Sequence, residues 1–270
     1  MRFTKSLRMA AAVTGLALAL TACSTDAGDT EDTEDPAAED AGALPAALED
    51  GDLSVCSDIP YSPFEFEEEG TATGYSGFDI ELIEAIAAEL GVEVTIQVTG
   101  FDAIQSGTAL AADSCDVAAS AMTITDEREQ NVDFLDPYFD ADQSLLVKVD
   151  GGVESLDDVT SLGVQADTTG QAYAVENFDG DITEFPGAAA LFSAMEAGTV
   201  DAILQDLPVN AERAQQDDSL TIAETYPTGE QYGFAVKEGS TELRDALNEG
   251  LQAVRDAGTY DELHSKYFEA

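Results

Sequence analysis

The stretch from Ser120 to Arg128, SAMTITDER, combines hydroxyl groups with a single guanidinium. Ten Lys and Arg stand against 56 Asp and Glu in the whole chain, and three of the ten fall within the first 23 residues. A guanidinium in so acidic a chain is suited to hold one small carboxylate by two parallel hydrogen bonds. Thr125, followed by two acids, has the pattern of a helix N-cap, where free N–H groups favour an anion. We predict that Arg128 anchors a carboxylate ligand; surface pairing with Glu127 or Glu129 is the alternative.

Catalytic constellations find little support in the sequence. The single histidine, His264, lies near the C-terminus, far from the other polar motifs. No Ser-His-Asp set, no His or Cys cluster with metal-ligand spacing and no phosphate-binding glycine loop can be assembled. We therefore predict that the protein is not an enzyme and uses neither a metal nor a cofactor.

The first 23 residues have the order of a bacterial export signal. Three basic residues precede the apolar stretch Met9 to Leu20, and a small-residue cleavage site ends at Cys23. This ending, LTAC, is similar to the lipobox of bacterial lipoproteins, whose cysteine becomes the lipid-modified first residue. We expect residues 1–23 to be a lipoprotein signal peptide and Cys23 to be lipidated. The chain would then be extracytoplasmic, anchored to the outer face of the cell membrane; an ordinary secretory signal is the alternative.

The segment that follows, residues 24–50, holds ten Asp or Glu and no Lys or Arg. It has too little apolar surface to offset the entropy of folding, so we expect an acidic, disordered tether. The formal net charge of −46 repels polyanions and excludes nucleic acid as a partner. Residues 51–270 are long enough to bury the core of one large domain or two small ones.

Two cysteines remain besides the one in the export signal, Cys56 and Cys115. Export to an oxidising compartment favours a structural disulfide between them. Two buried free thiols are the alternative.

Short apolar runs alternate with segments of helical period after residue 52, which is the pattern of βαβ units and a parallel sheet. In the first series we expect strands at 53–56, 92–98 and 117–121, with helices at 78–90 and 101–110. In the second series we expect strands at 144–149, 161–165, 182–185, 202–204 and 232–236, with helices at 170–177, 188–197, after Pro208, 242–257 and 260–268. Two such series indicate an α/β protein with two lobes and a cleft, although one continuous sheet would give a similar pattern.

The residues from Leu53 to Tyr267 resemble a known family, the extracellular solute-binding proteins of type 3, which are the amino-acid receptors of ABC importers. The resemblance rests on motifs in a specific order: Asp58-Ile59-Pro60-Tyr61-Ser62-Pro63-Phe64-Glu65, Gly77-Phe78-Asp79-Ile80, Phe101-Asp102, Met122-Thr123-Ile124-Thr125 with Arg128, Phe134 with Pro137-Tyr138, Gly163-Val164-Gln165, Thr168-Thr169-Gly170, Gly198-Thr199-Val200-Asp201-Ala202 with Asp206, and Tyr232-Gly233. It implies a two-lobed periplasmic-binding-protein type II fold, each lobe a mainly parallel sheet flanked by helices. We expect lobe 1 at 51–140 and 231–270, and lobe 2 at 141–230.

The resemblance also implies how a carboxylate would be held in the cleft. Arg128 would clamp the α-carboxylate of the ligand, aided by Thr123, and Thr169 would donate to the same carboxylate from the other lobe. Taken alone, Asp167 or Thr168 reads as a helix N-cap. The family usually has Gly where Asp167 stands, which is a departure in the local backbone or charge.

The other site residues follow from the same resemblance. Asp206 would pair with the ligand ammonium, a group that Ser120 and Ala121 would share. Asp58 would contact the amine or the side chain, although a turn or cap role is equally open. The aromatic rings that would cover the carbon skeleton of the ligand, with a core role as their alternative, are Tyr61 and Phe101.

Together these features imply a membrane-anchored receptor that binds a small zwitterionic ligand, which we expect to be an amino acid, and delivers it to the permease of an ABC importer. We expect a monomer whose lobes close over the ligand by hinge motion. The acidic composition and Asp58 favour a polar or cationic ligand side chain. The alternatives are a dehydratase-like enzyme on the same fold and a ligand-sensing module.

Overall fold

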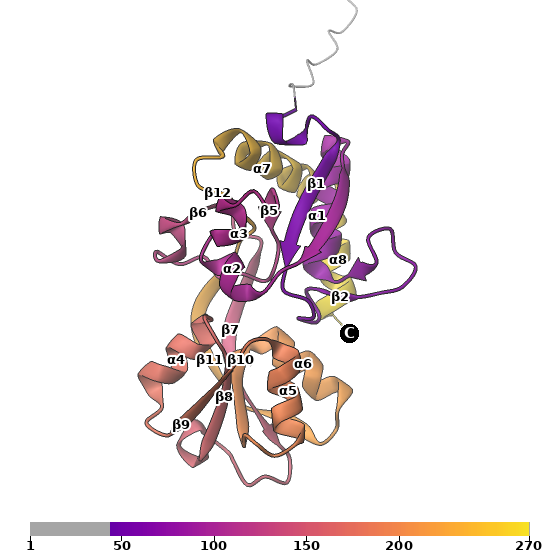
Figure 1. Ribbon diagram of the computed structural model, residues 1–270. Coiled ribbons are helices and arrows are strands. Elements are labelled where there is room, and N and C mark those ends of the chain that lie inside the picture. Colours follow the sequence, from indigo (N-terminus) through magenta and orange to yellow (C-terminus); the bar gives the residue numbers. More distant parts are fainter. Residues whose placement is uncertain (1–43, 270) are drawn as a thin grey trace, which may run out of the picture. The chain divides into compact units, whose positions relative to one another are not determined.

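Two five-stranded sheets with flanking helices make up most of residues 44–269, the part of the chain that this computed structural model describes (Figure 1). The predicted signal peptide, Cys23 and most of the predicted tether lie outside the described residues. Within residues 44–269 no helix is long and apolar enough to cross a membrane.

The first sheet is mixed, with a parallel centre. Its strand order is β4 (Glu93–Val98), β1 (Asp52–Ser57), β5 (Val117–Ala118), β12 (Ala235–Lys237) and β6 (Val132–Phe134). Strand β1 pairs in parallel with β4 and β5, whereas β12 runs antiparallel to β5 and β6. A late segment of the chain thus returns to complete the sheet that the first segment began. A small separate hairpin pairs β2 (Phe66–Glu67) with β3 (Tyr75–Ser76).

Helices α1 (Phe78–Leu90), α7 (Thr241–Asp256) and α8 (Thr259–Phe268) pack together beside the first sheet. Helix α1 occupies the residues predicted for it and ends at Gly91, whose left-handed backbone suits a C-cap. It begins after Gly77, where a Cβ atom would lie 2.2 Å from the carbonyl oxygen of Phe64. Only glycine allows this close approach, which sets the helix against the loop that carries Phe64.

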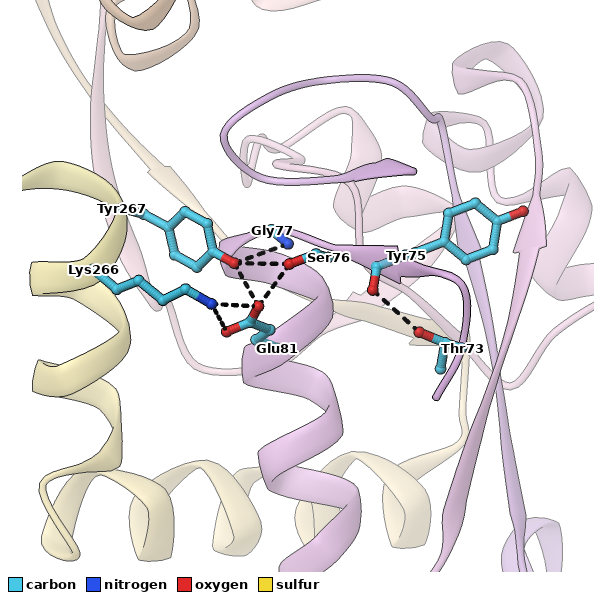
Figure 2. A network of polar contacts seen from close by, with 7 residues as sticks. All are labelled: Thr73, Tyr75, Ser76, Gly77, Glu81, Lys266 and Tyr267. Carbon is cyan, nitrogen blue, oxygen red and sulfur yellow. Dashed lines mark hydrogen bonds and ion pairs between the residues drawn. The ribbon is translucent and has the colours of Figure 1, made fainter. Parts of the chain in front are cut away.

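Figure 2 shows how polar contacts attach the C-terminal helix α8 to the start of α1. The carboxylate of Glu81 accepts hydrogen bonds from Lys266, at 2.7 Å, and from the hydroxyl of Tyr267, at 2.6 Å. Ser76 donates to the same carboxylate, and the backbone N–H of Gly77 donates to Tyr267. The last helix is therefore tied to the helix that follows the hairpin.

The predicted helix at 101–110 and the predicted strand at 117–121 differ from the structure. Two short helices, α2 (Phe101–Gln105) and α3 (Thr108–Ala111), replace the single helix, because Gly107 has a φ of +70°. Strand β5 ends at Ala118, and the residues after it leave the sheet.

The second sheet has the order β11 (Leu220–Tyr232), β7 (Phe139–Lys148), β10 (Ala202–Asp206), β8 (Ser161–Gln165) and β9 (Asp181–Phe185). Strands β10, β8 and β9 are parallel, whereas β7 runs antiparallel to β10 and β11. Helix α4 (Thr169–Asn177) packs with Leu145, Val147 and Leu204, while α5 (Ala188–Glu196) packs with Leu146 and Ile203. Because alternate strand residues face opposite sides, α4 and α5 cover opposite faces of this sheet. Helix α6 (Leu207–Gln216) follows β10, and a short 3-10 helix, η3 (Leu156–Asp158), precedes β8.

Strand β11 is the largest element that the sequence did not predict. The predicted strand at 232–236 combines the last residue of β11 with the first two residues of β12, and Gly233 and Phe234 separate these two strands. Strand β7 also begins at Phe139, earlier than predicted.

The predicted disulfide between Cys56 and Cys115 is confirmed. It joins β1 to the loop before β5, across a sequence separation of 59 residues. Both residues are buried in a core cluster that also contains Phe101 and Met122.

The last residues of the predicted tether are part of the fold, which corrects the expectation that the tether extends to Asp50. A 3-10 helix, η1 (Ala46–Leu48), directly precedes β1, and the side chain of Leu48 is fully buried in the first core cluster. Leu48 supplies the apolar surface that the acidic stretch before it lacks.

Candidate functional site

One cavity gathers every residue that the sequence predicted for ligand binding. Its lining consists of Asp58, Tyr61, Phe101, Ser120, Ala121, Thr123, Arg128, Thr169 and Asp206, with Gln165 and Thr168 in addition. These last two residues were not among the predicted ligand-binding residues.

The lining residues follow the carboxyl ends of strands from both sheets. Asp58 comes directly after β1, and Ser120 follows β5. In the second sheet, Gln165 and Asp206 are the last residues of β8 and β10, and Thr169 begins α4. Ligand sites of open α/β sheets occur at such strand ends.

Arg128 is buried in this cavity, with 5% of the residue exposed. Its Nη1 donates to the carbonyl oxygen of Thr123 at 2.8 Å, and its Nη2 donates to the carbonyl oxygen of Asp167 at 3.1 Å. The guanidinium also lies 5.1 Å from the centre of the Phe101 ring, within the range of a cation–π interaction. The alternative of an exposed Arg128 paired with a neighbouring Glu is therefore wrong.

The backbone around Arg128 is a single turn, which corrects the expectation of a helix N-terminus there. Residues Arg128–Gln130 form only a 3-10 helix, η2. The hydroxyl of Thr125 does accept the backbone N–H of Arg128, at 3.2 Å, as a cap would. A three-residue turn contributes little helix dipole, so an anion here would depend on the guanidinium.

Asp206 lies in the same cavity and is almost fully buried. Its Oδ2 accepts hydrogen bonds from the hydroxyls of Tyr61, at 2.7 Å, and Tyr232, at 2.6 Å. Gln143 donates to its other oxygen. Burial raises the pKa of Asp206, while these donors and the positive charge of Arg128 act in the opposite direction. The cavity thus holds one buried cation and one buried carboxylate.

Asp58, the second carboxylate of the cavity, is held between the two sheets. Its Oδ2 accepts a hydrogen bond from Nε2 of Gln165 at 2.8 Å, and its backbone N–H donates to the hydroxyl of Ser120 at 3.0 Å. That hydroxyl donates in turn to Glu65, a fully buried residue behind the cavity. Burial raises the pKa of Asp58 to about 6, and the bond from Gln165 opposes that shift.

The two threonines predicted to contact a carboxylate face each other, with 3.4 Å between the hydroxyls of Thr123 and Thr169. A third group, Glu230 on β11, accepts hydrogen bonds from both. Glu230 was not predicted as a site residue, because no local pattern distinguishes it among the 56 Asp and Glu of the chain.

The backbone before α4 explains the departure at Asp167. This residue has a φ of +63°, in the left-handed region that glycine adopts most easily and that Asp tolerates. Thr168 is the N-cap of α4, since its hydroxyl accepts the backbone N–H of Gln171 at 3.1 Å. The N-cap interpretation of Thr168 is therefore confirmed, and the residue also lines the cavity.

The two aromatic residues predicted for the site lie at the boundary between the hydrophobic core and the cavity. Tyr61 and Phe101 are 9% and 7% exposed, and each belongs to a hydrophobic core cluster while also lining the cavity. Phe64 and Phe78 are fully buried core residues. Within residues 44–269 no group of three or more His, Cys, Asp or Glu is placed to hold a metal ion.

The chain is similar to known proteins over most of its length. Residues 53–270 match the family described as bacterial extracellular solute-binding proteins, family 3. A protein named "Probable histidine-binding protein" from Neisseria gonorrhoeae is 30% identical, over 96% of this chain and 94% of that protein. The glutamine-binding protein GlnH of an ABC transporter in Bacillus subtilis is 32% identical, over 71% of this chain and 72% of its own length.

Solved structures show the same fold. The arginine-, lysine-, histidine-binding protein ArtJ from Geobacillus stearothermophilus superposes with a TM-score of 0.73 and 32% sequence identity. The match covers 81% of this chain and 96% of that protein. The predicted fold class is therefore confirmed, and the names of these relatives, all binding proteins, agree with the prediction that the chain is not an enzyme.

Proposed function

Because the chain belongs to the bacterial extracellular solute-binding proteins of family 3, we propose that it binds an amino acid in the cavity around Arg128 and delivers it to the permease of an ABC importer. The observation that carries this proposal is that a buried guanidinium, Arg128, and a buried carboxylate, Asp206, line one cavity. A zwitterion brings one charge for each of them.

Arg128 keeps donors for a ligand carboxylate. A guanidinium has five N–H groups, and the carbonyl oxygens of Thr123 and Asp167 occupy one on each Nη atom. The remaining N–H groups and the hydroxyls of Thr123 and Thr169 suit the two oxygens of an α-carboxylate. Asp206 suits the α-ammonium, in a cavity whose other walls include the rings of Tyr61 and Phe101.

The ligand side chain is proposed to be cationic. Asp58 adds a second carboxylate to the cavity, so the lining holds two acids and one cation. An amino acid with a neutral side chain would leave the charge of Asp58 without a partner. The names of several relatives refer to arginine, lysine or histidine, which supports the same class.

We further propose that the two sheets act as two lobes, with lobe 1 formed by 51–140 and 231–270 and lobe 2 by 141–230. Strands β7 and β11 would then be the connections that bend when the lobes close. A ligand carboxylate that contacts both Arg128 and Thr169 stabilises the closed arrangement, since only there do both donors reach it. Small-angle scattering with and without L-arginine measures this closure, and an unchanged radius of gyration despite binding would contradict it.

A thermal-shift screen of the twenty amino acids tests the function directly. A ligand at a hundred times its Kd stabilises the folded state by about 2.7 kcal/mol, so a bound amino acid raises the melting temperature. We expect arginine, lysine or histidine to give the largest increase. If none of the twenty raises the melting temperature, the amino-acid proposal is wrong, and if only neutral ones do, the cationic class is wrong.

Replacing Arg128 by Ala should weaken binding by about 2–5 kcal/mol, the usual cost of removing one partner of a buried charge pair. Isothermal titration calorimetry measures the loss. Arg244→Ala is the matched control, since Arg244 pairs with Asp245 near the surface and does not line the cavity. Equal affinity in Arg128→Ala and the parent would exclude Arg128 as the anchor.

We propose that the chain is held at the membrane by a lipid on Cys23. The support is the order of the first 23 residues, with basic, apolar and small residues ending in this cysteine. Mass spectrometry of the mature protein from a membrane fraction should find an N-terminal Cys23 with a diacylglycerol-sized increment. An unmodified Cys23 in the mature protein would contradict lipid anchoring.

A further inference from the structure

Glu230 reaches the cavity from a point where β11 is irregular. The pairing of β11 with β7 shifts in register between Tyr226 and Glu230, so the residues between them lie outside the ladder. Glu230 then pairs with Ala141. The irregularity aims a partly buried carboxylate at the residues that line the cavity, as β-bulges often do near functional sites.

The carboxylate of Glu230 accepts hydrogen bonds from both sides of the cavity. Its Oε2 lies 3.1 Å from the hydroxyl of Thr169 and 3.5 Å from the hydroxyl of Thr123. Nε2 of Gln143 donates to the same oxygen at 2.9 Å. Glu230 thus contacts the two hydroxyls that the proposed function assigns to the ligand carboxylate.

The threonine hydroxyls cannot donate to Glu230 and to a ligand carboxylate at the same time. A threonine hydroxyl carries one hydrogen, and an ionised carboxylate can only accept hydrogen bonds. When Glu230 is ionised, the hydrogens of Thr169 and Thr123 point at it and not at a ligand. When Glu230 is protonated, its own O–H can donate to the oxygen of Thr169, and the hydrogen of Thr169 is free to turn to the ligand.

We propose that Glu230 is a positioning residue whose protonation sets the affinity of the carboxylate site, so that ligand binding takes up one proton from solvent at Glu230. This inference rests on the proposed function, because it needs the carboxylate of an amino acid beside Arg128. The proton taken up resides on Glu230, and the hydroxyl hydrogen of Thr169 moves its hydrogen bond to the ligand without leaving its oxygen.

The charges around Glu230 favour this uptake. Burial and the nearby negative charge of Asp206 on β10 raise the pKa of Glu230, whereas Gln143, Thr169 and Thr228 donate to its ionised form and oppose the shift. Arg128 is the cation that faces it, and it interacts with Glu230 and Asp206 alike. A ligand carboxylate would engage this guanidinium and add a second negative charge, which raises the pKa of Glu230 further.

The protonation of Glu230 makes ligand affinity depend on pH. Because the bound form holds the proton more tightly than the free form, affinity is highest at low pH and falls as pH rises through the pKa of Glu230 in the free protein. Asp58 and Asp206 also titrate and act in the opposite direction on a cationic ligand. Their contribution is common to the parent and to variants at residue 230, so the ratio of Kd values isolates Glu230.

Calorimetric titration of Glu230→Gln with L-arginine tests the inference. Gln is neutral and can donate to Thr169 as a protonated Glu does. We expect the variant to bind as tightly as the parent near pH 5 and about tenfold more tightly near pH 8, the size of one hydrogen bond to a charged group. Repeating the titrations in two buffers of different ionisation enthalpy should show that the parent takes up more protons on binding than the variant does.

Glu238→Gln is the matched control, since it removes one negative charge from an exposed residue a short way along the chain. The ratio of its Kd for L-arginine to that of the parent should not change with pH. A Kd ratio between Glu230→Gln and the parent that does not change with pH would overturn the inference while leaving the proposed function intact. Weaker binding in that variant than in the parent at high pH would do the same. A parent that binds none of the twenty amino acids would contradict both.

Discussion

Two fully buried carboxyl groups, Glu65 and Asp79, lie behind the cavity floor. Oδ2 of Asp79 accepts the backbone N–H of Ala121 at 2.7 Å and the hydroxyl of Tyr138 at 2.6 Å. Oε2 of Glu65 and Oδ1 of Asp79 have no hydrogen-bond partner among the described residues. Burial raises the pKa of Asp79 to about 7, although its two donors oppose that shift, and both burial and Asp79 raise the pKa of Glu65. Such carboxyls stay protonated well above their usual range.

Asp79 therefore makes stability depend on pH. The folded-state pKa of about 7 lies above the ordinary 3.8, so the folded protein binds this proton more tightly than the unfolded chain. Its contribution to the free energy of unfolding is complete below about pH 4 and is lost as pH rises to about 7. Asp79→Asn, which resembles the protonated acid, should remove this part of the dependence, on the order of 1–3 kcal/mol.

Urea unfolding of the parent and Asp79→Asn at about pH 5 and pH 8 measures the difference. Repulsion among the many surface acids also favours low pH, but it is nearly the same in both proteins. The prediction fails if the two proteins lose equal stability between these pH values.

Some residues of the cavity could be predicted from the sequence and others could not. Arg128 stood out because cations are rare in this chain, and the remaining predicted positions followed from motifs. Gln165 lies within the motif Gly163-Val164-Gln165, but whether a residue at a strand end faces the cavity depends on the register of the strand. Glu230 depends on a bulge in a strand that was itself not predicted. The positive φ of Asp167 gives a physical reason for the glycine usual at that position.

The disulfide acts at the scale of elements, since it closes a segment that contains α1, β4, α2 and α3. The chain-entropy model assigns about 4 kcal/mol at most to a loop of this length. We expect a reducing agent to lower the urea midpoint of the parent by an amount within that limit. A Cys56→Ala/Cys115→Ala double variant should start near the reduced value and show no response to reductant. A parent that is indifferent to reduction would show that the bridge contributes no stability.

Elements with a strong period were predicted well, and those set by distant contacts were not. Helix α1 has apolar residues at helical spacing and glycine on both sides, so its bounds are local properties. Strand β11 contains Pro227 and Gly229 and many exposed polar residues, which together hide its strand character. It is a strand because β7 supplies the antiparallel partner. The placement of the Arg128 guanidinium likewise depends on bonds to the carbonyl oxygens of Thr123 and Asp167 that sequence spacing does not reveal.

At the scale of the whole molecule, the alternation of strands and helices indicated two α/β series. The pairing order of the sheets could not be read from it, because β12 joins the first sheet after a long excursion of the chain. The antiparallel pairing of β7 with β10 and β11 also has no local signature. Periodicity identifies the parts, and contacts between residues far apart in the sequence decide how the parts combine.

Three hydrogen bonds at the cavity join residues near the first sheet to residues of the second: Tyr61 to Asp206, Gln165 to Asp58, and Arg128 to the carbonyl of Asp167. A fourth, from Ser62 to Glu212, joins the two parts outside the cavity lining. Under the proposed function, a ligand that enters while the lobes are closed requires these bonds to break together. The frequency of such openings, and not the frequency of collisions, would then limit the rate of binding. The association rate of such a receptor would rise with ligand concentration only until every opening leads to binding. Above that concentration the rate would stay constant.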